Sequence, residues 1–353
     1  MSEVSSWGII GPGHVGGEIT RQINQEHVAE RLGLEMSPRF VMRSSGIYYP
    51  DSENAAHQRL EEIDDFPDVT FLAMPTTDDG AIAHGYLEEI LSRGKLAVTA
   101  EKGALANYFE ELKETSDDFN RLGYNASVGG GTHMIEAGKQ YTQDKSNVTQ
   151  IHLALNGTLS AIFSQVGPLQ GSGNSLGQAV TLATKLDYAE PGAESPYKVI
   201  KAEAEGDIPK KTSIFFNSLG LGEEVLDWKD LKFELDDEEI AQAVEEAKAR
   251  RFIVSIYSTS DKLVAPGAKY PEGDIIGGFD YQHEDWQIVG GFRNVNRNPL
   301  FSNLADASGP LAGFVIGLGP NETDGIYSLT GPGAGVSPTA NAMIDDYVVR
   351  KQR

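Results

Sequence analysis

The sequence predicts an α/β protein in which a doubly wound parallel sheet is followed by a mixed α/β region with its own sheet. Over the first 135 residues, short apolar runs alternate with amphipathic stretches. Strands that alternate with helices are typical of a parallel sheet covered on both faces. The pattern changes after Val148, and a chain of 353 residues is long enough for about two domains.

The elements of the first region follow from these runs. Strands are expected at Trp7–Ile10, Phe40–Met42, Val69–Met74 and Leu96–Thr99. Helices are expected at Glu18–Leu34, Ile82–Leu91 and Leu105–Leu112.

The second region contains apolar runs separated by Gly-, Pro- and Asn-rich turns, which indicate strands and helices of a second sheet. Strands are expected at Thr149–Leu155, Phe252–Tyr257, Trp286–Val289 and Phe314–Leu318. Helices are expected at Leu176–Lys185, Lys210–Leu219 and Glu238–Lys248, and Gly331–Gly335 is expected to open a last helix at Ser337–Val349.

Composition excludes several classes of function. The chain has no cysteine, which removes disulfides, thiolate metal sites and cysteine nucleophiles. Its 29 Lys and Arg against 52 Asp and Glu give a formal charge of −23, and such a surface repels nucleic acid and anionic membranes. Nothing in the sequence has the length of a membrane span or the pattern of a signal peptide. We therefore expect a cytoplasmic protein.

The first motif is Gly11-Pro12-Gly13-His14-Val15-Gly16, which follows an apolar strand and opens a helix. In this context the first glycine permits the tight turn and the second lets the backbone approach a pyrophosphate. The third lets helix and strand pack closely, with the helix N-terminus facing the anion. The motif predicts a Rossmann-type dinucleotide-binding domain.

The end of the second strand bears on the choice of dinucleotide. It reads Val41-Met42-Arg43-Ser44-Ser45 and lacks the carboxylate that normally binds the ribose of NAD. An arginine and two hydroxyls suit a 2′-phosphate, so we expect NADP rather than NAD. The alternative is that Arg43 is simply solvated.

Two other patterns are interpreted as structural. Ser175 lies in a G-x-S-x-G sequence but is preceded by a loop rather than a strand, so it is expected to cap the following helix rather than to be a hydrolase nucleophile. The seven histidines show no metal-ligand spacing.

Asp207 and Lys211 are four residues apart, and Pro209 suits the start of a helix. The spacing predicts that both side chains share one helix face. They could hold a polar substrate and exchange a proton, or form an ordinary exposed ion pair. Lys102 follows a strand whose C-terminal end is expected to face the ligand crevice.

Taken together, the motifs resemble homoserine dehydrogenase. The matches keep the family's order over nearly the whole chain: Gly11–Gly16, Thr99–Gly103, Ser127–Gly131, Asn156–Thr158, Tyr188–Pro191, the Asp207–Lys211 spacing and Gly331–Gly335 followed by Pro338-Thr339-Ala340.

The resemblance implies an NAD(P)-binding domain at 1–135 joined by 331–353, a catalytic and dimerisation domain at 136–330, and a homodimer. It implies reduction of L-aspartate 4-semialdehyde to L-homoserine with NAD(P)H. Lys211 and Asp207 match the proton-transfer pair, and Lys102 the lysine after the fourth strand. The residues that the resemblance implies for substrate binding are Glu190, Tyr188, Thr158 and Gly157. The residues expected to bind the cofactor are Gly11, Gly13, His14, Val15, Gly16, Arg43, Thr76, Lys102 and Gly335. The carbonyls of Val128 and Gly130 are candidate ligands of a monovalent cation such as sodium.

This sequence also departs from the family. Gly206 precedes Asp207 directly, the segment from Glu190 to Asp207 is longer, and Glu101 replaces the usual asparagine. Glu203 and Glu205 are candidate equivalents of a further family acid. These departures keep two alternatives open: a related dehydrogenase of another small amino or hydroxy acid, and a catalytically silent NADP-binding protein.

Overall fold

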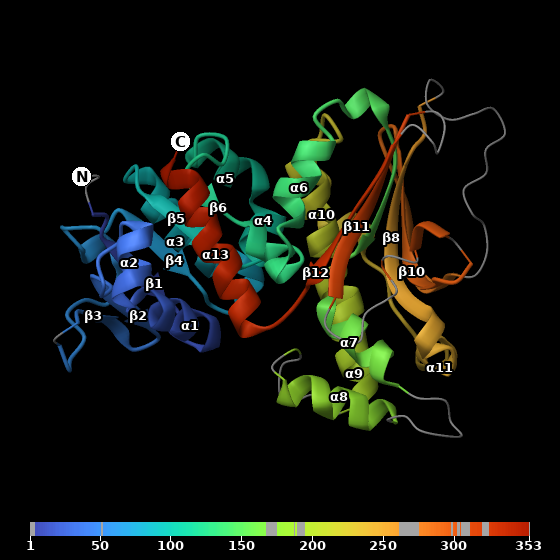
Figure 1. Ribbon diagram of the computed structural model, residues 1–353, viewed down its shortest axis with the longest axis horizontal. Coiled ribbons are helices and arrows are strands. Elements are labelled where there is room, and N and C mark those ends of the chain that lie inside the picture. Colours follow the sequence, from blue (N-terminus) through green and yellow to red (C-terminus); the bar gives the residue numbers. More distant parts are fainter. Residues whose placement is uncertain are drawn as a thin grey trace. The chain divides into compact units, whose positions relative to one another are not determined.

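The computed structural model describes residues 4–50, 52–166, 175–186, 188, 195–260, 275–297, 299–301, 304, 311–319 and 325–352 (Figure 1). The chain forms two compact units. The first unit is Met1–Ser127 with Val336–Arg353, and the second is Val128–Gly335.

The first unit is built on a six-stranded sheet in the order β3-β2-β1-β4-β5-β6. Its strands are β1 (Trp7–Ile10), β2 (Phe40–Arg43), β3 (Gly46–Tyr48), β4 (Val69–Leu72), β5 (Leu96–Thr99) and β6 (Leu122–Gly123). All neighbours are parallel except β3, which pairs antiparallel to β2. This confirms the expected doubly wound sheet, with β4 ending two residues early.

Helices pack around this sheet. They are α1 (His14–Ile23), α2 (Glu26–Leu32), α3 (Ala81–Ser92), α4 (Gly103–Asn107), α5 (Phe109–Thr115) and α13 (Val336–Lys351). The expected single helices Glu18–Leu34 and Leu105–Leu112 are each wrong, because both are broken. On one continuous helix, Ala29 and Leu32 would not share the face of Ile19. The extended backbone at Gln25 separates α1 from α2, so both helices can bury their apolar residues.

The last helix completes the core of the first unit. In α13, Met343 and Tyr347 are fully buried among side chains of the early strands. The ring of Phe71 lies 6.1 Å from that of Trp7 and 6.3 Å from that of Tyr347, with edge-to-face packing in both pairs. Edge-to-face pairs add to the free energy gained by burial, so residues far apart in sequence stabilise one core.

The second unit has an antiparallel sheet in the order β12-β11-β7-β8-β10-β9. Its strands are β7 (Val148–Ala154), β8 (Arg250–Ser258), β9 (Ile275–His283), β10 (Trp286–Asn294), β11 (Leu311–Leu318) and β12 (Ile326–Pro332). Strands β9 and β12 were not expected. Gly331 and Pro332 end β12 rather than opening the last helix.

The helices of the second unit are α6 (Met134–Tyr141), α7 (Gly157–Gln165), α8 (Leu176–Lys185), α9 (Pro196–Lys201), α10 (Ile208–Leu219) and α11 (Asp237–Glu245). Helices α6, α7 and α10 lie along one face of the sheet (Figure 1). A π-helical turn, Ala202–Asp207, joins α9 to α10. Ser175 caps α8 as predicted, because its hydroxyl accepts from Gln178 N and the Gln178 side chain accepts from Ser175 N.

Short 3₁₀ turns connect these elements, at Leu60–Glu62, Asp78–Gly80, Asn125–Ser127, Gly130–Thr132, Lys145–Asn147, Trp228–Leu231, Ala247–Ala249 and Pro299–Phe301. Among the helices that the structure describes, none is long and apolar enough to cross a bilayer.

A buried polar cluster lies on β7, β8 and β10. His152 is fully buried, and its Nδ1 lies 2.8 Å from the hydroxyl of Ser255. Arg293 Nη1 donates to the same hydroxyl at 3.1 Å. Burial, and then the charge of Arg293, lower the pKa of His152 from 6.5 to about 3. The imidazole is therefore neutral in the folded chain over the physiological range.

This cluster makes stability depend on pH. Folding lowers the pKa of His152, so the neutral imidazole contributes fully to the free energy of unfolding above pH 6.5. This contribution is lost as the pH falls toward about 3. Lowering the pH from about 6.5 to about 5 should reduce the free energy of unfolding by about 2 kcal/mol through this group. Urea unfolding of the wild type and of His152→Gln at both pH values measures it. An equal fall in both proteins would contradict the prediction.

Candidate functional site

The glycine loop between β1 and α1 has the geometry of an anion cradle. Gly11 has a φ of +81°, and a Cβ there would lie 2.5 Å from the carbonyl oxygen of Ala73. A Cβ on Gly16 would lie 2.2 Å from the carbonyl oxygen of Gly11. A Cβ on Gly13 would meet nothing within 4 Å. The first and third glycines are thus required by packing, whereas Gly13 leaves space open at the N-terminus of α1.

Two of the predicted cofactor contacts follow Gly13 directly. His14 is exposed and is the first residue of α1, while Val15 is half-buried and packs against the core of the first unit. The α1 helix has ten residues and no acidic side chain in its first turn. Its N-terminal N–H groups and dipole therefore favour an anion such as a pyrophosphate.

The hairpin after β2 places Arg43 at the carboxyl end of the sheet. Its guanidinium lies 5.3 Å from the centre of the Tyr48 ring. The hydroxyls of Ser45 and Tyr48 are 2.8 Å apart. Arg43, Ser44 and Ser45 are all exposed, so a cation and hydroxyl groups are available together at this edge.

Two further predicted cofactor residues belong to the loops after β4 and β5. Thr76 is exposed, and its hydroxyl donates to the carboxylate of Glu101. That carboxylate also accepts from the backbone N–H groups of Gly103 and Ala104, each at 2.7 Å. Glu101 therefore ties the two loops together and caps α4, and Lys102 lies half-buried beside it.

In the second unit, Asp207 and Lys211 form an ion pair at the start of α10. Lys211 Nζ lies 2.6 Å from Asp207 Oδ2, and each side chain is only 10% exposed. Lys211 Nζ also donates to the carbonyl oxygen of Leu155 at 3.2 Å. Pro209 lies in the first turn of α10, as predicted. The pair shares one helix face, but it is buried rather than an exposed ion pair.

Asn156, which is not among the predicted site residues, links this pair to a second carboxylate. Its Oδ1 accepts from Leu159 N at 2.7 Å and caps α7. Its Nδ2 donates to Asp207 Oδ2 at 2.8 Å and to Glu203 Oε2 at 2.6 Å. Of the two candidate family acids, Glu203 joins the site. The signal that could have found Asn156 is a helix-capping residue directly after a strand.

The predicted substrate residues lie partly beside this cluster. Gly157 and Thr158 follow Asn156 at the start of α7, and the Thr158 hydroxyl donates to the carbonyl oxygen of Tyr188. A Cβ on Gly157 would lie 2.6 Å from the carbonyl carbon of Gly333. Only glycine therefore allows the start of α7 to lie this close to the Gly333 backbone. Glu190 lies outside the described residues.

The predicted cation ligands lie on the segment Val128–Gly130. Val128 is fully buried, and Gly130 packs against Gly333, with a φ of +55°. Gly335, which is one of the predicted cofactor-binding residues, has a φ of +115°, a conformation that favours glycine. No group of three His, Asp or Glu side chains among the described residues could hold a metal ion. Asn125 donates its side-chain and backbone N–H groups to Asp346, at 2.6 and 2.7 Å.

Comparison with known proteins connects these features to one family. The family model described as homoserine dehydrogenase matches residues 134–348. The homoserine dehydrogenase of Helicobacter pylori is 28% identical over 355 residues, which cover 97% of this chain and 72% of that protein. The NAD(+)-dependent homoserine dehydrogenase of Pseudomonas canavaninivorans is 28% identical, over 76% of this chain and 66% of its own length.

Solved structures share the fold. The homoserine dehydrogenase of Thermoplasma acidophilum superposes with a TM-score of 0.71 at 16% identity, covering 99% of both chains. A hyperthermophilic archaeal homoserine dehydrogenase in complex with NADPH gives a TM-score of 0.64 at 19% identity, covering 99% of this chain and 98% of that one.

Proposed function

Because the chain belongs to the homoserine dehydrogenase family, we propose that it reduces L-aspartate 4-semialdehyde to L-homoserine with NAD(P)H. The observation that carries this proposal is the buried Asp207–Lys211 pair beside Asn156. An ammonium group held in a nearly dry site can both donate a proton and stabilise a developing negative charge.

We assign the steps to side chains as follows. The nicotinamide ring supplies a hydride when it is bound. Lys211 donates a proton from Nζ to the substrate's carbonyl oxygen as negative charge develops there. Asp207 fixes the direction of the ammonium group through its 2.6 Å contact. Asn156 holds Asp207 in place, so the pair is positioned before substrate binds.

Substrate recognition is proposed for the residues around α7. Glu190 accepts the substrate's ammonium group, and Tyr188, Thr158 and Gly157 line the same pocket. The contact from the Thr158 hydroxyl to Tyr188 supports this grouping, because it ties the segment carrying Tyr188 to the N-terminus of α7.

The cofactor is proposed to be a nicotinamide dinucleotide, bound by Gly11, Gly13, His14, Val15 and Gly16 through its pyrophosphate. Thr76, Lys102 and Gly335 are further proposed contacts. The open space above Gly13 supports the assignment, since a phosphate group can approach the backbone there. NADP is the proposed form because Arg43 and two serine hydroxyls stand where a carboxylate would bind NAD.

Replacing Arg43 by Ala tests the cofactor preference. The variant should lose about 1.5 to 3 kcal/mol of NADPH binding, which is the free energy of a charge-assisted hydrogen bond. Binding of NADH should change by less than about twofold, because NADH carries no 2′-phosphate. Fluorescence titration with both cofactors measures the difference. Equal losses for both, or no loss, would show that Arg43 does not recognise the phosphate.

Three further assignments are proposed with the family. The protein is a homodimer and is cytoplasmic. The Val128 and Gly130 carbonyls are a candidate position for a monovalent cation, although no group of three His, Asp or Glu side chains among the described residues could hold a metal ion. Catalysis by Lys211 as described above uses no such ion.

Oxidation of L-homoserine with NADP⁺ and NAD⁺ at alkaline pH tests the function. Turnover of L-homoserine well above that of other small amino and hydroxy acids would support the proposal. Turnover of a different acid would identify a related dehydrogenase. Tight NADP⁺ binding without any turnover would identify a silent binding protein, and both of those outcomes overturn the proposal.

A further inference from the structure

Tyr48 lies beside Arg43, but no step of the proposed function uses it. It belongs to β3, which pairs antiparallel to β2 after the two-residue turn Ser44-Ser45. The centre of its ring lies 5.3 Å from the guanidinium of Arg43. A guanidinium within about 6 Å of the centre of an aromatic ring is attracted to that ring. The ring of Tyr48 therefore affects where the Arg43 side chain lies.

The register of the β2–β3 hairpin brings these two side chains together. Arg43 pairs with Gly46, and Val41 pairs with Tyr48. Residues two apart on a strand face the same side, so Tyr48 is the diagonal neighbour of Arg43 across the hairpin. Gly46, the direct partner of Arg43, has no side chain that could contact the guanidinium. The contact to the ring thus follows from the hairpin itself.

The hairpin is fixed to the rest of the first unit at the residue before Tyr48. Ile47 N donates to His57 O, and Ala56 N donates to Ile47 O, each at 2.8 Å. The side chain of Ile47 is fully buried. The backbone that carries Tyr48 is therefore held in place before any ligand arrives.

This hairpin adjoins the glycine loop. Gly11 N donates to Met42 O at 3.1 Å, and Met42 directly precedes Arg43. In this fold, a dinucleotide with its pyrophosphate at the N-terminus of α1 has its adenosine ribose at the end of β2. The pair of Arg43 and Tyr48 is thus at the position that the ribose is expected to occupy.

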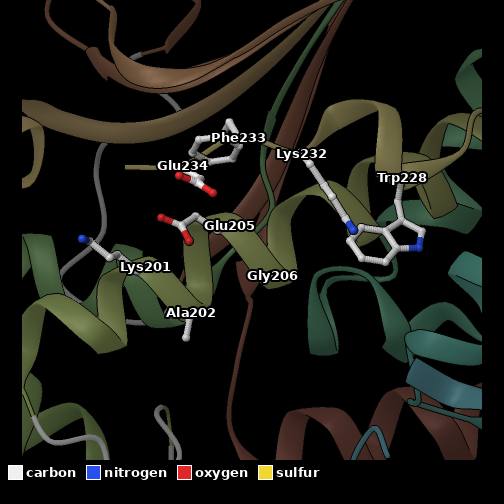
Figure 2. Close-up of a pocket in the computed structure, with 8 residues that line it drawn as sticks. All are labelled: Lys201, Ala202, Glu205, Gly206, Trp228, Lys232, Phe233 and Glu234. Carbon is white, nitrogen blue, oxygen red and sulfur yellow. The ribbon is translucent and has the colours of Figure 1, made fainter. Parts of the chain in front are cut away.

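Arg43 is a cation without an ion pair in a strongly acidic protein. The chain has 52 Asp and Glu against 29 Lys and Arg, and other cations use these carboxylates. Arg39 pairs with Glu35 at 2.8 Å, and Lys201, which lines the hollow of the second unit shown in Figure 2, pairs with Asp237 at 2.8 Å. Among the residues that the structure describes, no carboxylate pairs with Arg43. Its charge is therefore available to an anionic ligand.

The hydroxyl groups beside Arg43 also keep a proton for such a ligand. Ser45 Oγ and Tyr48 Oη lie 2.8 Å apart. Two hydroxyl groups carry two protons, and the hydrogen bond between them uses one. The other O–H can donate to a phosphate oxygen, whichever of the two residues carries it.

We propose that Tyr48 is a positioning residue for the 2′-phosphate of NADP. Its ring holds the Arg43 guanidinium in the orientation that binds the phosphate, so Tyr48 helps to set the preference for NADP over NAD. An arginine that is ordered before the cofactor binds loses less conformational freedom on binding. This inference rests on the proposed function, and it goes further because it assigns part of the cofactor discrimination to an aromatic ring that acts through Arg43.

Fluorescence titrations with NADPH and NADH, without substrate, test the proposal. The measured quantity is the discrimination, which is the Kd for NADH divided by the Kd for NADPH. Tyr48→Leu removes the ring and should lower the discrimination by about threefold or more, as expected for the loss of an exposed contact between a cation and a ring. Its Kd for NADH should stay within about twofold of the wild-type value, because NADH has no 2′-phosphate.

Two variants serve as controls. Tyr48→Phe keeps the ring, and Ser45 keeps its hydroxyl proton, so the discrimination should stay within about twofold of the wild-type value. Tyr49→Leu is the matched tyrosine control. Tyr49 is the next residue and is 37% exposed, and its ring packs edge-to-face on that of His57 at 5.8 Å between centres. This variant should leave the discrimination unchanged.

A double-mutant cycle shows whether Tyr48 acts through Arg43. In the Arg43→Ala background, Tyr48→Leu should change the Kd for NADPH by less than about twofold. A smaller loss of discrimination from Tyr48→Leu alone, an equal loss in the Arg43→Ala background, or a loss of NADH binding would overturn the inference. A wild type that binds both cofactors equally would also overturn it. Because these titrations contain no substrate, their outcome is distinct from a failure to oxidise L-homoserine.

Discussion

Lys211→Met is expected to lower kcat by about 100- to 10,000-fold, the usual contribution of a general acid or base. The loss should appear in both directions of the reaction, because the group that donates a proton in reduction accepts it in oxidation. Steady-state rates with L-homoserine and NADP⁺ measure one direction, and L-aspartate 4-semialdehyde with NADPH the other. A loss below about tenfold in kcat would show that Lys211 does not transfer the proton.

Folding must be controlled in this experiment, because removing one partner of a buried pair leaves the other charge uncompensated, at a cost of about 3 to 5 kcal/mol. The double variant Asp207→Asn with Lys211→Met removes both charges and should recover most of that stability while staying inactive. The neighbouring Lys210→Met is the matched lysine control. It should retain activity within about threefold, since the Lys210 ammonium group lies 4.6 Å from the centre of the Trp228 ring.

Gly13→Asp is expected to abolish cofactor binding without weakening the fold. The new carboxylate occupies the space at the N-terminus of α1 and repels the pyrophosphate there, which should raise the Kd for NADP⁺ and NADPH at least about 100-fold. Gly13 is the N-cap of α1 and has extended backbone, with φ −72° and ψ −152°. Aspartate is a better N-cap than glycine, so unfolding should be unchanged or slightly more costly.

Two variants separate charge from bulk in this test. Gly13→Asn fills the same space without a charge and should lose less affinity than Gly13→Asp. Gly17→Ala lies four residues on, on the exposed face of α1, where a Cβ comes no closer than 3.9 Å to Pro12 O, and should leave binding unchanged. Calorimetric titration with NADP⁺ and thermal unfolding measure both effects. Equal binding by Gly13→Asp and wild type would place the cofactor elsewhere.

The fold was predictable where apolar patterning was strong. The strands around Ile9 and Phe71 are buried on both faces and read as continuous apolar runs. Strand β9 was missed because it contains Gly277 and Gly278, both with positive φ, and glycine is depleted in strands. Strand β12 was missed because its residues are exposed or half-buried and end in Pro332, so no alternation was visible.

The candidate site was only partly predictable. The spacing of Asp207 and Lys211 predicted that their side chains share one helix face. It could not predict that both side chains are buried, because burial depends on how α10 and α7 pack. The contact from Asn156 to Glu203 joins residues 47 apart in the sequence. It depends on the π-helical turn Ala202–Asp207, which shifts the residues that follow by one position relative to an α-helix, and no propensity indicates such a turn.

The path of the chain also constrains how the protein is made. The strands that hold Trp7 and Phe71 leave the ribosome first, but the Tyr347 ring that covers them is synthesised after the whole of Val128–Gly335. At common elongation rates this interval is roughly 10 to 40 seconds. During it, the nascent first unit exposes an apolar surface. The second unit has its complete sequence at the end of this interval, before α13 is synthesised. Folding on the ribosome therefore finishes in the reverse of the usual order, and the early strands are the segment that a chaperone has to protect.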